Sequence, residues 1–483
     1  MVLDFGGQQA LSTAQRLRSI RVFSLVLPGS ASLETIRAAM PKGIVLAGGD
    51  AAQEPLPLDC ALLDMGIPVL ATGASARRMA EVLGGQTHGV SIDRRTAQIS
   101  FGASPLFSGL EESDRYFDRV EELLLPEGMK PIANSSAGLT PAFSNEEKRL
   151  YGLQFYAESN DPDGLAILRN FALDICQCDP WWTMEEFVER KTQKLRQQIG
   201  DGNVLMAISG GVDSSVSAAL LARAVGDRLT CLFVDTGLLR KGEVELVERA
   251  YREQLSIRLV RVDARQRVLA QLSGVTAPEE KRRRIENTLF QVLQEQAAAL
   301  GGAAFTADGA IYPDMLAKAN LAKTGADNHV LHPLQHLFKA EVRLAGEVLQ
   351  VPREMISRQP FPGPGLAIRI MGEVTENKLT MLREADAIFR QEIAEAGLDK
   401  RIWQYFAILT GLHSFGTRDG QTCYETAVAL RAVSSSDAVT ANAYRLPYDL
   451  LERVALRITT EIPGINRVLY DVTGKPSAMI EWE

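Results

Sequence analysis

The chain has 483 residues, of which 23% are charged and 46% are hydrophobic, a composition typical of a globular protein with several domains. Its formal net charge of −8 argues against broad binding to nucleic acid, which requires clustered cations. No apolar run approaches the roughly eighteen residues that span a bilayer, and no basic stretch precedes an apolar one at the start. We therefore expect a cytoplasmic protein that binds neither nucleic acid nor membranes.

In the first part of the chain, strand-like apolar segments alternate with helical patterns. Strands are predicted at residues 22–27, 43–46 and 69–70, and helices at residues 11–18 and 76–83. This alternation predicts a parallel sheet with helices on its faces. The segment Cys178-Asp179-Pro180 marks the end of this part, and a new helix is predicted to begin at Thr183.

The second part repeats the alternation. Strands are predicted at residues 204–208, 229–234, 257–262 and 303–307, and a long helix at residues 278–300. These elements predict a doubly wound parallel sheet, which binds its ligand at the carboxyl ends of the strands. The basic cluster Lys281-Arg282-Arg283-Arg284 lies in the long helix, and we interpret it as a solvated face rather than a phosphate contact.

The most informative segment is Ser209-Gly210-Gly211-Val212-Asp213-Ser214-Ser215, between a predicted strand and a predicted helix. Glycines let the backbone approach a phosphate group, and the free N–H groups of a helix start favour negative charge there. The serine hydroxyls add donors, and Asp213 can hold Mg²⁺. The segment lacks the lysine of the kinase and GTPase phosphate loop and the spacing of the dinucleotide fingerprint. It resembles the pyrophosphate loop of ATP pyrophosphatases, which adenylylate a carbonyl oxygen, release pyrophosphate and let a nucleophile displace AMP.

A loop at residues 361–366 opens the third part of the chain. It is too rich in proline and glycine to be a helix or a central strand. A helix is predicted at residues 378–396, followed by several short strands that end with residues 468–471. We therefore predict an α+β domain.

Over nearly its full length the chain resembles the GMP synthetases, which aminate XMP at carbon 2. The matching segments, in chain order, are Leu3-Asp4-Phe5-Gly6, Cys176-Gln177-Cys178, the pyrophosphate loop, Phe233-Val234-Asp235, Gly237-Leu238-Leu239-Arg240, Ile311-Tyr312-Pro313-Asp314, Leu337-Phe338-Lys339, Glu341-Val342-Arg343, residues 360–366, Leu430-Arg431-Ala432-Val433, Gly474-Lys475-Pro476 and Ile480-Glu481-Trp482-Glu483. The resemblance implies three α/β or α+β domains. They are a class I glutamine amidotransferase-like domain at residues 1–178, a doubly wound ATP pyrophosphatase domain of the adenine nucleotide alpha hydrolase type at 179–360, and a dimerisation and nucleotide-binding domain at 361–483.

The amidotransferase part lacks the catalytic residues that the resemblance implies. The family uses a cysteine in a Gly-x-Cys-x-Gly turn, with a histidine and a glutamate from a Gln-Phe-His-Pro-Glu segment. Here Gly73 stands at the nucleophile position and Tyr156 at the histidine position. Ser75 is no replacement, because no base would activate it. We predict a structural or partner-binding relic that does not hydrolyse glutamine.

The pyrophosphatase part keeps its expected residues. The resemblance assigns ATP binding to Ser209, Gly210, Gly211, Val212, Ser214, Ser215, Val234, Gly237 and Leu238. Asp213 and Lys339 are the expected catalytic residues, Asp213 as the magnesium ligand and Lys339 as the cation that neutralises the polyphosphate. The alternative for Lys339 is a solvated side chain. Asp314 either orients substrate or metal or serves as a helix N-cap.

The acceptor side departs from the family pattern. The expected contacts to the acceptor are Gly363, Pro364, Gly365, Lys475, Ile480 and Glu481. The lid, residues 315–333 with Asp327-Asn328-His329, is shorter than that of the family and lacks its Lys-Ser-His-His-Asn segment. Thr422 and His413 stand where the family has arginines, and Gln359 stands where it has a histidine. Losing guanidinium groups weakens phosphate binding, so the expected acceptor includes nucleotides other than XMP.

Three hypotheses for the function follow. In the first, ATP and Mg²⁺ drive adenylylation of a purine nucleotide carbonyl, and ammonia or another amine from outside displaces AMP. In the second, sulfide or a sulfur carrier attacks the same carbon and gives a thiopurine nucleotide, for example from GMP. In the third, the protein is an ATP-binding regulator without catalysis. The expected partners are the nucleotide, an enzyme that supplies ammonia or sulfide, and a second copy of the chain in a homodimer.

The five cysteines bear on the sulfur hypothesis. They are Cys60, Cys176, Cys178, Cys231 and Cys423. Their odd number and the lack of paired zinc spacing predict reduced thiols. Cys423 lies near the altered phosphate site, where it could carry a persulfide, although a packed or exposed thiol is the favoured interpretation.

Overall fold

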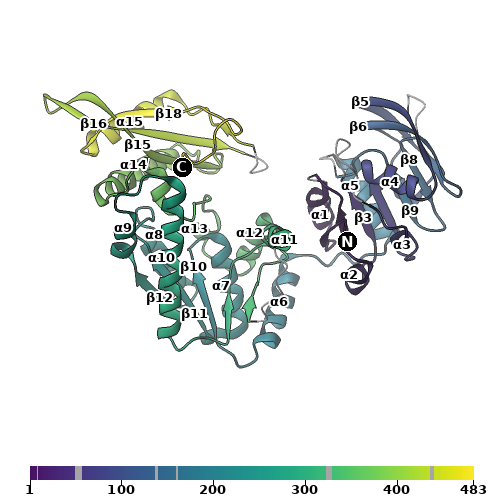
Figure 1. The fold of residues 1–483 in the computed structure, drawn as a ribbon, viewed down its shortest axis with the longest axis horizontal. Helices are drawn as coiled ribbons and strands as arrows, with labels where there is room; N and C mark the ends of the chain where they lie inside the picture. The colour runs from purple at the N-terminus through teal and green to yellow at the C-terminus, as the bar shows by residue number, and fades with distance from the viewer. Residues whose placement is uncertain (8, 49–56, 136–139, 159–160, 322–328, 436–439) are drawn as a thin grey trace. The chain divides into compact units, whose positions relative to one another are not determined.

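The computed structural model describes the chain except for residues 8, 49–56, 136–139, 159–160, 322–328 and 436–439, and gives the backbone alone for 88–95, 118–121 and 318–321. The chain forms two compact units, Met1–Glu186 and Phe187–Glu483 (Figure 1). Helix α6 (Met184–Ile199) runs through this division, just after the junction predicted at residue 178. Asp327 and Asn328 of the predicted lid lie outside the described residues.

The described residues of the first unit form a nine-stranded sheet with the order β2-β1-β3-β4-β9-β8-β7-β5-β6. The strands from β2 to β9 in this order are parallel, and the remaining pairs are antiparallel. The strands are β1 Val2–Asp4, β2 Val26–Pro28, β3 Ile44–Ala47, β4 Val69–Thr72, β5 Gln86–Phe101, β6 Glu112–Leu124, β7 Lys130–Ser135, β8 Ala142–Asn145 and β9 Leu150–Leu153; the helices are α1 Gln9–Ser19, α2 Leu33–Ala38, α3 Cys60–Leu63, α4 Ala74–Val82 and α5 Pro162–Arg169.

The strand predicted at residues 22–27 is shorter in the structure, because β2 begins only at Val26. Before it, the carbonyl of Leu25 still accepts the N–H of Val2 in β1 at 2.8 Å, whereas Val22 and Ser24 bond to helix α1. The hydroxyl of Ser24 donates to the carbonyl of Ala14 at 3.0 Å, and Nη2 of Arg18 donates to the carbonyl of Ser24 at 2.8 Å. These side-chain bonds replace the ladder bonds that a longer strand would have made.

The second unit contains a five-stranded parallel sheet with the order β12-β11-β10-β13-β14 among its described residues. A second sheet follows, in which β15 and β16 form a long antiparallel hairpin and β18 pairs with β16. The strands are β10 Val204–Ile208, β11 Leu229–Asp235, β12 Arg258–Asp263, β13 Phe305–Ala307, β14 Val330–Leu331, β15 Gln404–Arg418, β16 Gln421–Ser434, β17 Asn442–Ala443 and β18 Ile465–Asp471; the helices beyond α6 are α7 Val212–Val225, α8 Glu243–Arg249, α9 Arg265–Leu272, α10 Pro278–Ala299, α11 Tyr312–Leu321, α12 Lys339–Val348, α13 Arg353–Ile356, α14 Glu376–Glu395 and α15 Tyr448–Glu461.

The expectation of several short strands in the third part is wrong for β15 and β16. The first half of β15 is buried and its second half is largely exposed, so the hairpin extends beyond the core that supports it. One hydrophobic cluster contains residues from both sides of position 360. Val234 and Leu238 precede this position, and Leu366, Leu382 and Leu409 follow it. The predicted second and third domains therefore share a core.

The interpretation of the basic cluster as a solvated face is wrong for Lys281. This side chain is fully buried, and its Nζ donates to the carbonyl of Ile370 at 2.7 Å and pairs with the Glu483 side chain. Arg283 is exposed and pairs with Glu280 on the surface of α10. A helix pattern could not reveal this difference, because the segments that cover Lys281 come from the far end of the chain.

No helix in the described part of the chain combines the length and apolar character that a membrane crossing requires. All five cysteines lie among the described residues, and their sulfur atoms form no disulfide. Burial raises the pKa of the Cys176 and Cys231 thiols to about 12. Both thiols are therefore protonated near neutral pH.

Candidate functional site

The predicted pyrophosphate loop connects strand β10 to helix α7 in the five-stranded sheet. Gly210 has a φ of +71°, which a residue with a side chain rarely adopts. A Cβ atom at this position would also lie 2.5 Å from Cγ2 of Val247 and 3.3 Å from Nη1 of Arg358. Glycine is thus required here by both conformation and space.

The serine hydroxyls of this loop hold the loop itself. Ser214 and Ser215 both donate to the carbonyl of Gly211, at 3.0 and 2.8 Å, and Ser209 accepts the N–H of Gly211 at 3.2 Å. Ser215 is fully buried and also contacts the hydroxyl of Tyr251 at 3.2 Å. The structure gives Ser215 a role in shaping the loop, whereas the sequence pattern suggested a direct phosphate donor.

A cavity of about 470 Å³ opens beside this loop, at the carboxyl ends of β10 and β11. Its lining includes Ser209, Gly211, Val212, Asp213, Val234, Lys339, Gly363 and Gly365 from the predicted sites. The cavity lining does not include Gly210, Ser214, Ser215, Gly237, Leu238, Pro364, Lys475, Ile480 or Glu481. The structure thus brings the catalytic pair together with four of the nine predicted ATP contacts.

Asp213 and Lys339 face each other in this cavity. Nζ of Lys339 lies 2.6 Å from Oδ2 of Asp213. Each residue lies in the first turn of its helix, Asp213 in α7 and Lys339 in α12. A cation at a helix N-terminus opposes the helix dipole, so the position of Lys339 is favourable only with an anion nearby. Asp213 supplies that anion here, and a polyphosphate could replace it.

The residues present fit a magnesium ion bound together with ATP. Oδ1 of Asp213 is buried and has no hydrogen-bond partner among the described residues. Mg²⁺ is commonly held by one or two carboxylates and the phosphates of the substrate, so one such oxygen suffices on the protein side. No group of three or more His, Cys, Asp or Glu side chains that could hold a metal ion occurs in the described part of the chain.

Arg343 and Arg358, to which the sequence had assigned no role, also line the cavity. Arg358 donates to the carbonyl of Gly210 and pairs with Glu243, and its side chain is largely buried. Arg343 donates to the carbonyl of Arg358 at 3.2 Å. No sequence signal marked Arg358, because its contact with the loop joins residues 148 positions apart.

One part of the cavity lining is apolar, and we call it the apolar wall. It contains Leu289 and Leu293 of helix α10 and Phe361. The guanidinium of Arg240 lies 4.7 Å from the centre of the Phe361 ring, and that of Arg369 lies 5.3 Å from it. This wall can take an adenine ring, whereas the glycine loop suits phosphates.

The predicted acceptor contacts near the end of the chain lie apart from this cavity. Glu481 accepts two hydrogen bonds, at 2.7 and 2.9 Å, from Arg369, which is fully buried. Ile480 packs against the cluster that contains Phe406, and the backbone of Lys475 pairs with Ala441.

The altered positions have defined partners. Oε1 of Gln359 accepts the N–H of Tyr405 at 2.9 Å. The ring of His413 stacks on that of Tyr424, with centroids 5.5 Å apart.

Asp314 caps helix α11. Its Oδ2 accepts the N–H of Ile311 at 3.0 Å, so the carboxylate acts from the third residue of the helix rather than from the N-cap position.

In the first unit, Gly73 forms the sharp turn between β4 and α4, with φ +58° and ψ −126°. A Cβ atom at Gly73 would collide with the ring of Tyr156, whose Cζ and hydroxyl oxygen would lie 2.7 and 2.9 Å away. The two departures from the amidotransferase pattern therefore occupy one space. Ser75 is buried, and its hydroxyl donates to the carbonyl of Gly48 at 2.8 Å.

The folds and the glycine turn define a multidomain protein with an amidotransferase-like unit and a nucleotide-binding unit. A model of the family described as glutamine amidotransferase class-I matches residues 1–175, and one described as GMP synthase C terminal domain matches residues 391–482. The predicted fold class is confirmed. The relatives include GMP synthase [glutamine-hydrolyzing] from Clostridium perfringens, 41% identical over 100% of this chain and 99% of its own, and that from Thermomicrobium roseum, 42% identical over 100% and 96%. The chain belongs to the GMP synthase family.

Proposed function

We propose that the protein catalyses the ATP-dependent amination of a purine nucleotide, through adenylylation of a carbonyl oxygen and displacement of AMP. The observation that carries this proposal is the pairing of Asp213 with Lys339 in the cavity beside the glycine loop. Membership of the GMP synthase family supports the same reaction. Retention of this pair also argues against a non-catalytic regulator.

The loop and its neighbours can position the reacting groups. The backbone N–H groups at the start of α7 and the Lys339 ammonium would hold the β and γ phosphates, and the apolar wall would hold adenine. Mg²⁺ bound to Asp213 would supply further neutralisation of the phosphate charge. An acceptor oxygen lying near Gly363 and Gly365 would then attack the α phosphorus, and pyrophosphate would leave. Positioning and charge stabilisation supply most of the catalysis.

We further propose that the nitrogen comes from free ammonia or another amine rather than from glutamine. The supporting observation is the ring of Tyr156 in the space that a side chain at position 73 would need. The relatives named above carry the words glutamine-hydrolyzing, whereas this chain has Gly73 and Tyr156 at the positions where we expect the cysteine and histidine of that activity. Sulfur transfer gains no support from those names, and the sulfur hypothesis rests on the altered acceptor side alone.

Because the acceptor side is altered, we propose that the acceptor is a purine nucleotide and that nucleotides other than XMP can serve. Thr422 and His413 offer no guanidinium for a phosphate. A homodimer is also proposed, because strands β15, β16 and β18 expose the large apolar side chains of Leu412, Phe415, Tyr424 and Leu469 to water. Covering exposed apolar side chains is a common driving force for association.

The test incubates the purified chain with MgATP, one of XMP, IMP or GMP, and one of ammonium, glutamine or sulfide, and measures pyrophosphate and product mass. We expect pyrophosphate and an aminated product with ammonium and none with glutamine. Asp213→Asn serves as the inactive control. Turnover with glutamine would contradict the proposed nitrogen source, and the absence of pyrophosphate with every acceptor would contradict the proposed chemistry.

A further inference from the structure

The turn that follows strand β11 forms part of the wall of the cavity. Thr236 and Leu239 line both the cavity and a second, smaller hollow of about 260 Å³, whereas Gly237 and Leu238 between them line the second hollow but not the first cavity. The position of this turn therefore sets the position of the cavity wall. Its contacts come from two directions.

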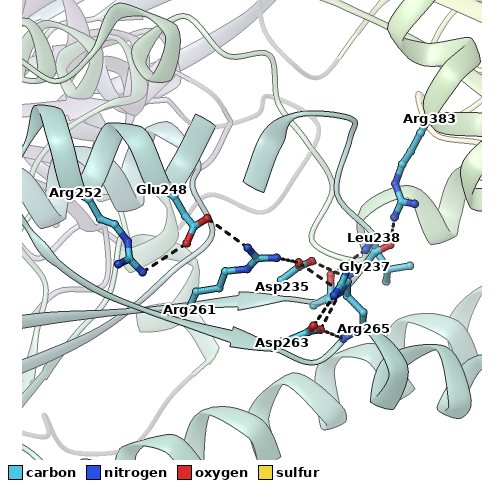
Figure 2. A network of polar contacts seen from close by, with 10 residues as sticks. Asp235, Gly237, Leu238, Glu248, Arg252, Arg261, Asp263, Arg265 and Arg383 are labelled. Carbon is cyan, nitrogen blue, oxygen red and sulfur yellow. Dashed lines mark hydrogen bonds and ion pairs between the residues drawn. The ribbon is translucent and has the colours of Figure 1, made fainter. Parts of the chain in front are cut away.

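From the sheet side, Asp235 holds the turn at its start (Figure 2). Its Oδ1 accepts the N–H of Gly237 at 3.0 Å, and its Oδ2 pairs with Arg261 at 2.9 Å. Arg265 pairs with Asp263 at 2.6 Å and presses against the turn, because a Cβ atom at Gly237 would lie 3.1 Å from Cβ of Arg265. Gly237 has a φ of +72°, so glycine is the residue suited to this place.

From the other side, three successive carbonyl groups of the turn accept hydrogen bonds from residues beyond position 360. Nη2 of Arg383 donates to the carbonyl of Gly237, and its Nε donates to that of Leu239 at 3.0 Å. The N–H of Leu366 donates to the carbonyl of Leu238 at 2.8 Å. Figure 2 shows Arg383 reaching from its helix to the turn. Helix α14 thus holds the turn through the hydrogen bonds of Arg383, on the side opposite Asp235.

The chemistry of Arg383 suits this task. Among the described residues, its guanidinium forms no ion pair, so its contacts with the turn are not incidental to a salt bridge. Burial is the largest influence on its pKa and lowers it, while Asp235 and Glu376 act to raise it. The planar fork of an arginine can serve two carbonyls at once, which a lysine ammonium cannot do with the same geometry.

We propose that Arg383 is a positioning residue for ATP. It spans the carbonyls of Gly237 and Leu239 and so holds Thr236 and Leu239 at the wall where the adenosine part of ATP would bind. The C-terminal part of the chain thereby completes the ATP site. This inference rests on the proposed function, because it takes the cavity as the ATP site.

The test uses the full chain with Arg383→Ala, Arg383→Lys and the matched control Lys241→Ala. Lys241 pairs with Glu384, the neighbour of Arg383 on α14, at 2.6 Å, and both side chains of this pair are exposed. The dissociation constant of MgATP, the KM for ATP and for the nucleotide acceptor, kcat and the Tm are measured for each variant. Arg383→Lys is included because it keeps the positive charge and an N–H donor group but not the planar fork, so the inference can still be tested if the alanine variant does not fold.

We expect Arg383→Ala to weaken MgATP binding by roughly tenfold, since two hydrogen bonds to a charged group are lost. Arg383→Lys should weaken it less, and the KM for the acceptor should change little in either variant. Lys241→Ala should bind MgATP as the wild type does. If Arg383→Lys bound MgATP as tightly as the wild type, or if both KM values rose together with a lower Tm, the inference would be overturned. A wild-type chain that binds no MgATP would overturn the proposed function as well, which separates the two failures.

Discussion

Nζ of Lys339 lies 2.6 Å from Oδ2 of Asp213, although the two residues are 126 positions apart. Two helix starts, those of α7 and α12, meet at this pair. Both ends offer N–H groups to an anion, and the lysine adds a full positive charge. The arrangement favours a polyphosphate between them more than it favours the ion pair itself.

We first expect Asp213→Asn and Lys339→Met to lower the rate of pyrophosphate release by about 100-fold or more, since each removes charge from the phosphate site. The Tm should change little, because a partly exposed pair contributes only about 0 to 1 kcal/mol. Arg223→Gln is the control and should keep full activity, because Arg223 lies on α7 like Asp213 but forms an exposed pair with Glu189 of α6. If the variants lost their activity only together with a large fall in Tm, this role for the pair would be contradicted.

Replacing Gly210 with alanine should abolish activity and destabilise the second unit. The backbone strain of a positive φ costs about 1 to 2 kcal/mol. The contact with Val247 adds an overpacking cost of about 1 to 3 kcal/mol. Gly397→Ala is the control, because Gly397 has a φ of +66° but nothing within 4 Å of its Cβ position. Denaturant unfolding of both variants should show the larger loss for Gly210→Ala.

The shared space of Gly73 and Tyr156 predicts a coupling between them. Gly73→Ala should destabilise the first unit by about 2 to 4 kcal/mol, from backbone strain and overpacking together. In a Tyr156→Ala background the same change should cost less, because only the strain remains. Hydrogen exchange of the amides of β4 measures both costs in a double-mutant cycle. Additive effects would show that the two residues do not compete for one space.

Lys191 predicts a rise of stability with pH. Burial, aided by the nearby Lys194, lowers the pKa of Lys191 to about 8 from its ordinary value of 10.5. Between these values the unfolded chain binds more protons than the folded one, so the free energy of unfolding should increase as the pH rises from about 8 to about 10.5. Lys191→Met should remove this increase, whereas Lys400→Met, at an exposed position, should keep it. An unchanged pH dependence in Lys191→Met would refute the assignment.

Local patterns in the chain predicted much of the second unit. The strand at residues 204–208 and the start of the long helix at residue 278 agree with the structure, because alternating apolar runs and helix-starting residues act over short distances. Lys339 was predicted to neutralise the polyphosphate, and in the structure it is the first residue of α12. Its partner in the cavity was not visible from pattern alone.

Contacts between distant segments explain the errors. Lys281 was interpreted as solvated because its neighbours in sequence are charged, yet the segments around Ile370 and Glu483 bury it. Arg358 was missed because a single arginine carries no motif, and its role appears only when it reaches the carbonyl of Gly210. Strand β2 is shorter than predicted because Val22 and Ser24 bond to α1 rather than to a neighbouring strand.

The sequence by itself determined the glycine loop and the alternation of strands and helices, and it led to the prediction that Gly73 and Tyr156 stand at the amidotransferase positions. These depend on residue type and short spacing. Only the tertiary structure decided that Tyr156 fills the space beside Gly73, that Asp213 meets Lys339, and that Arg383 grips the turn after β11. Such relationships arise from packing between segments far apart in the chain, and no local pattern encodes that packing.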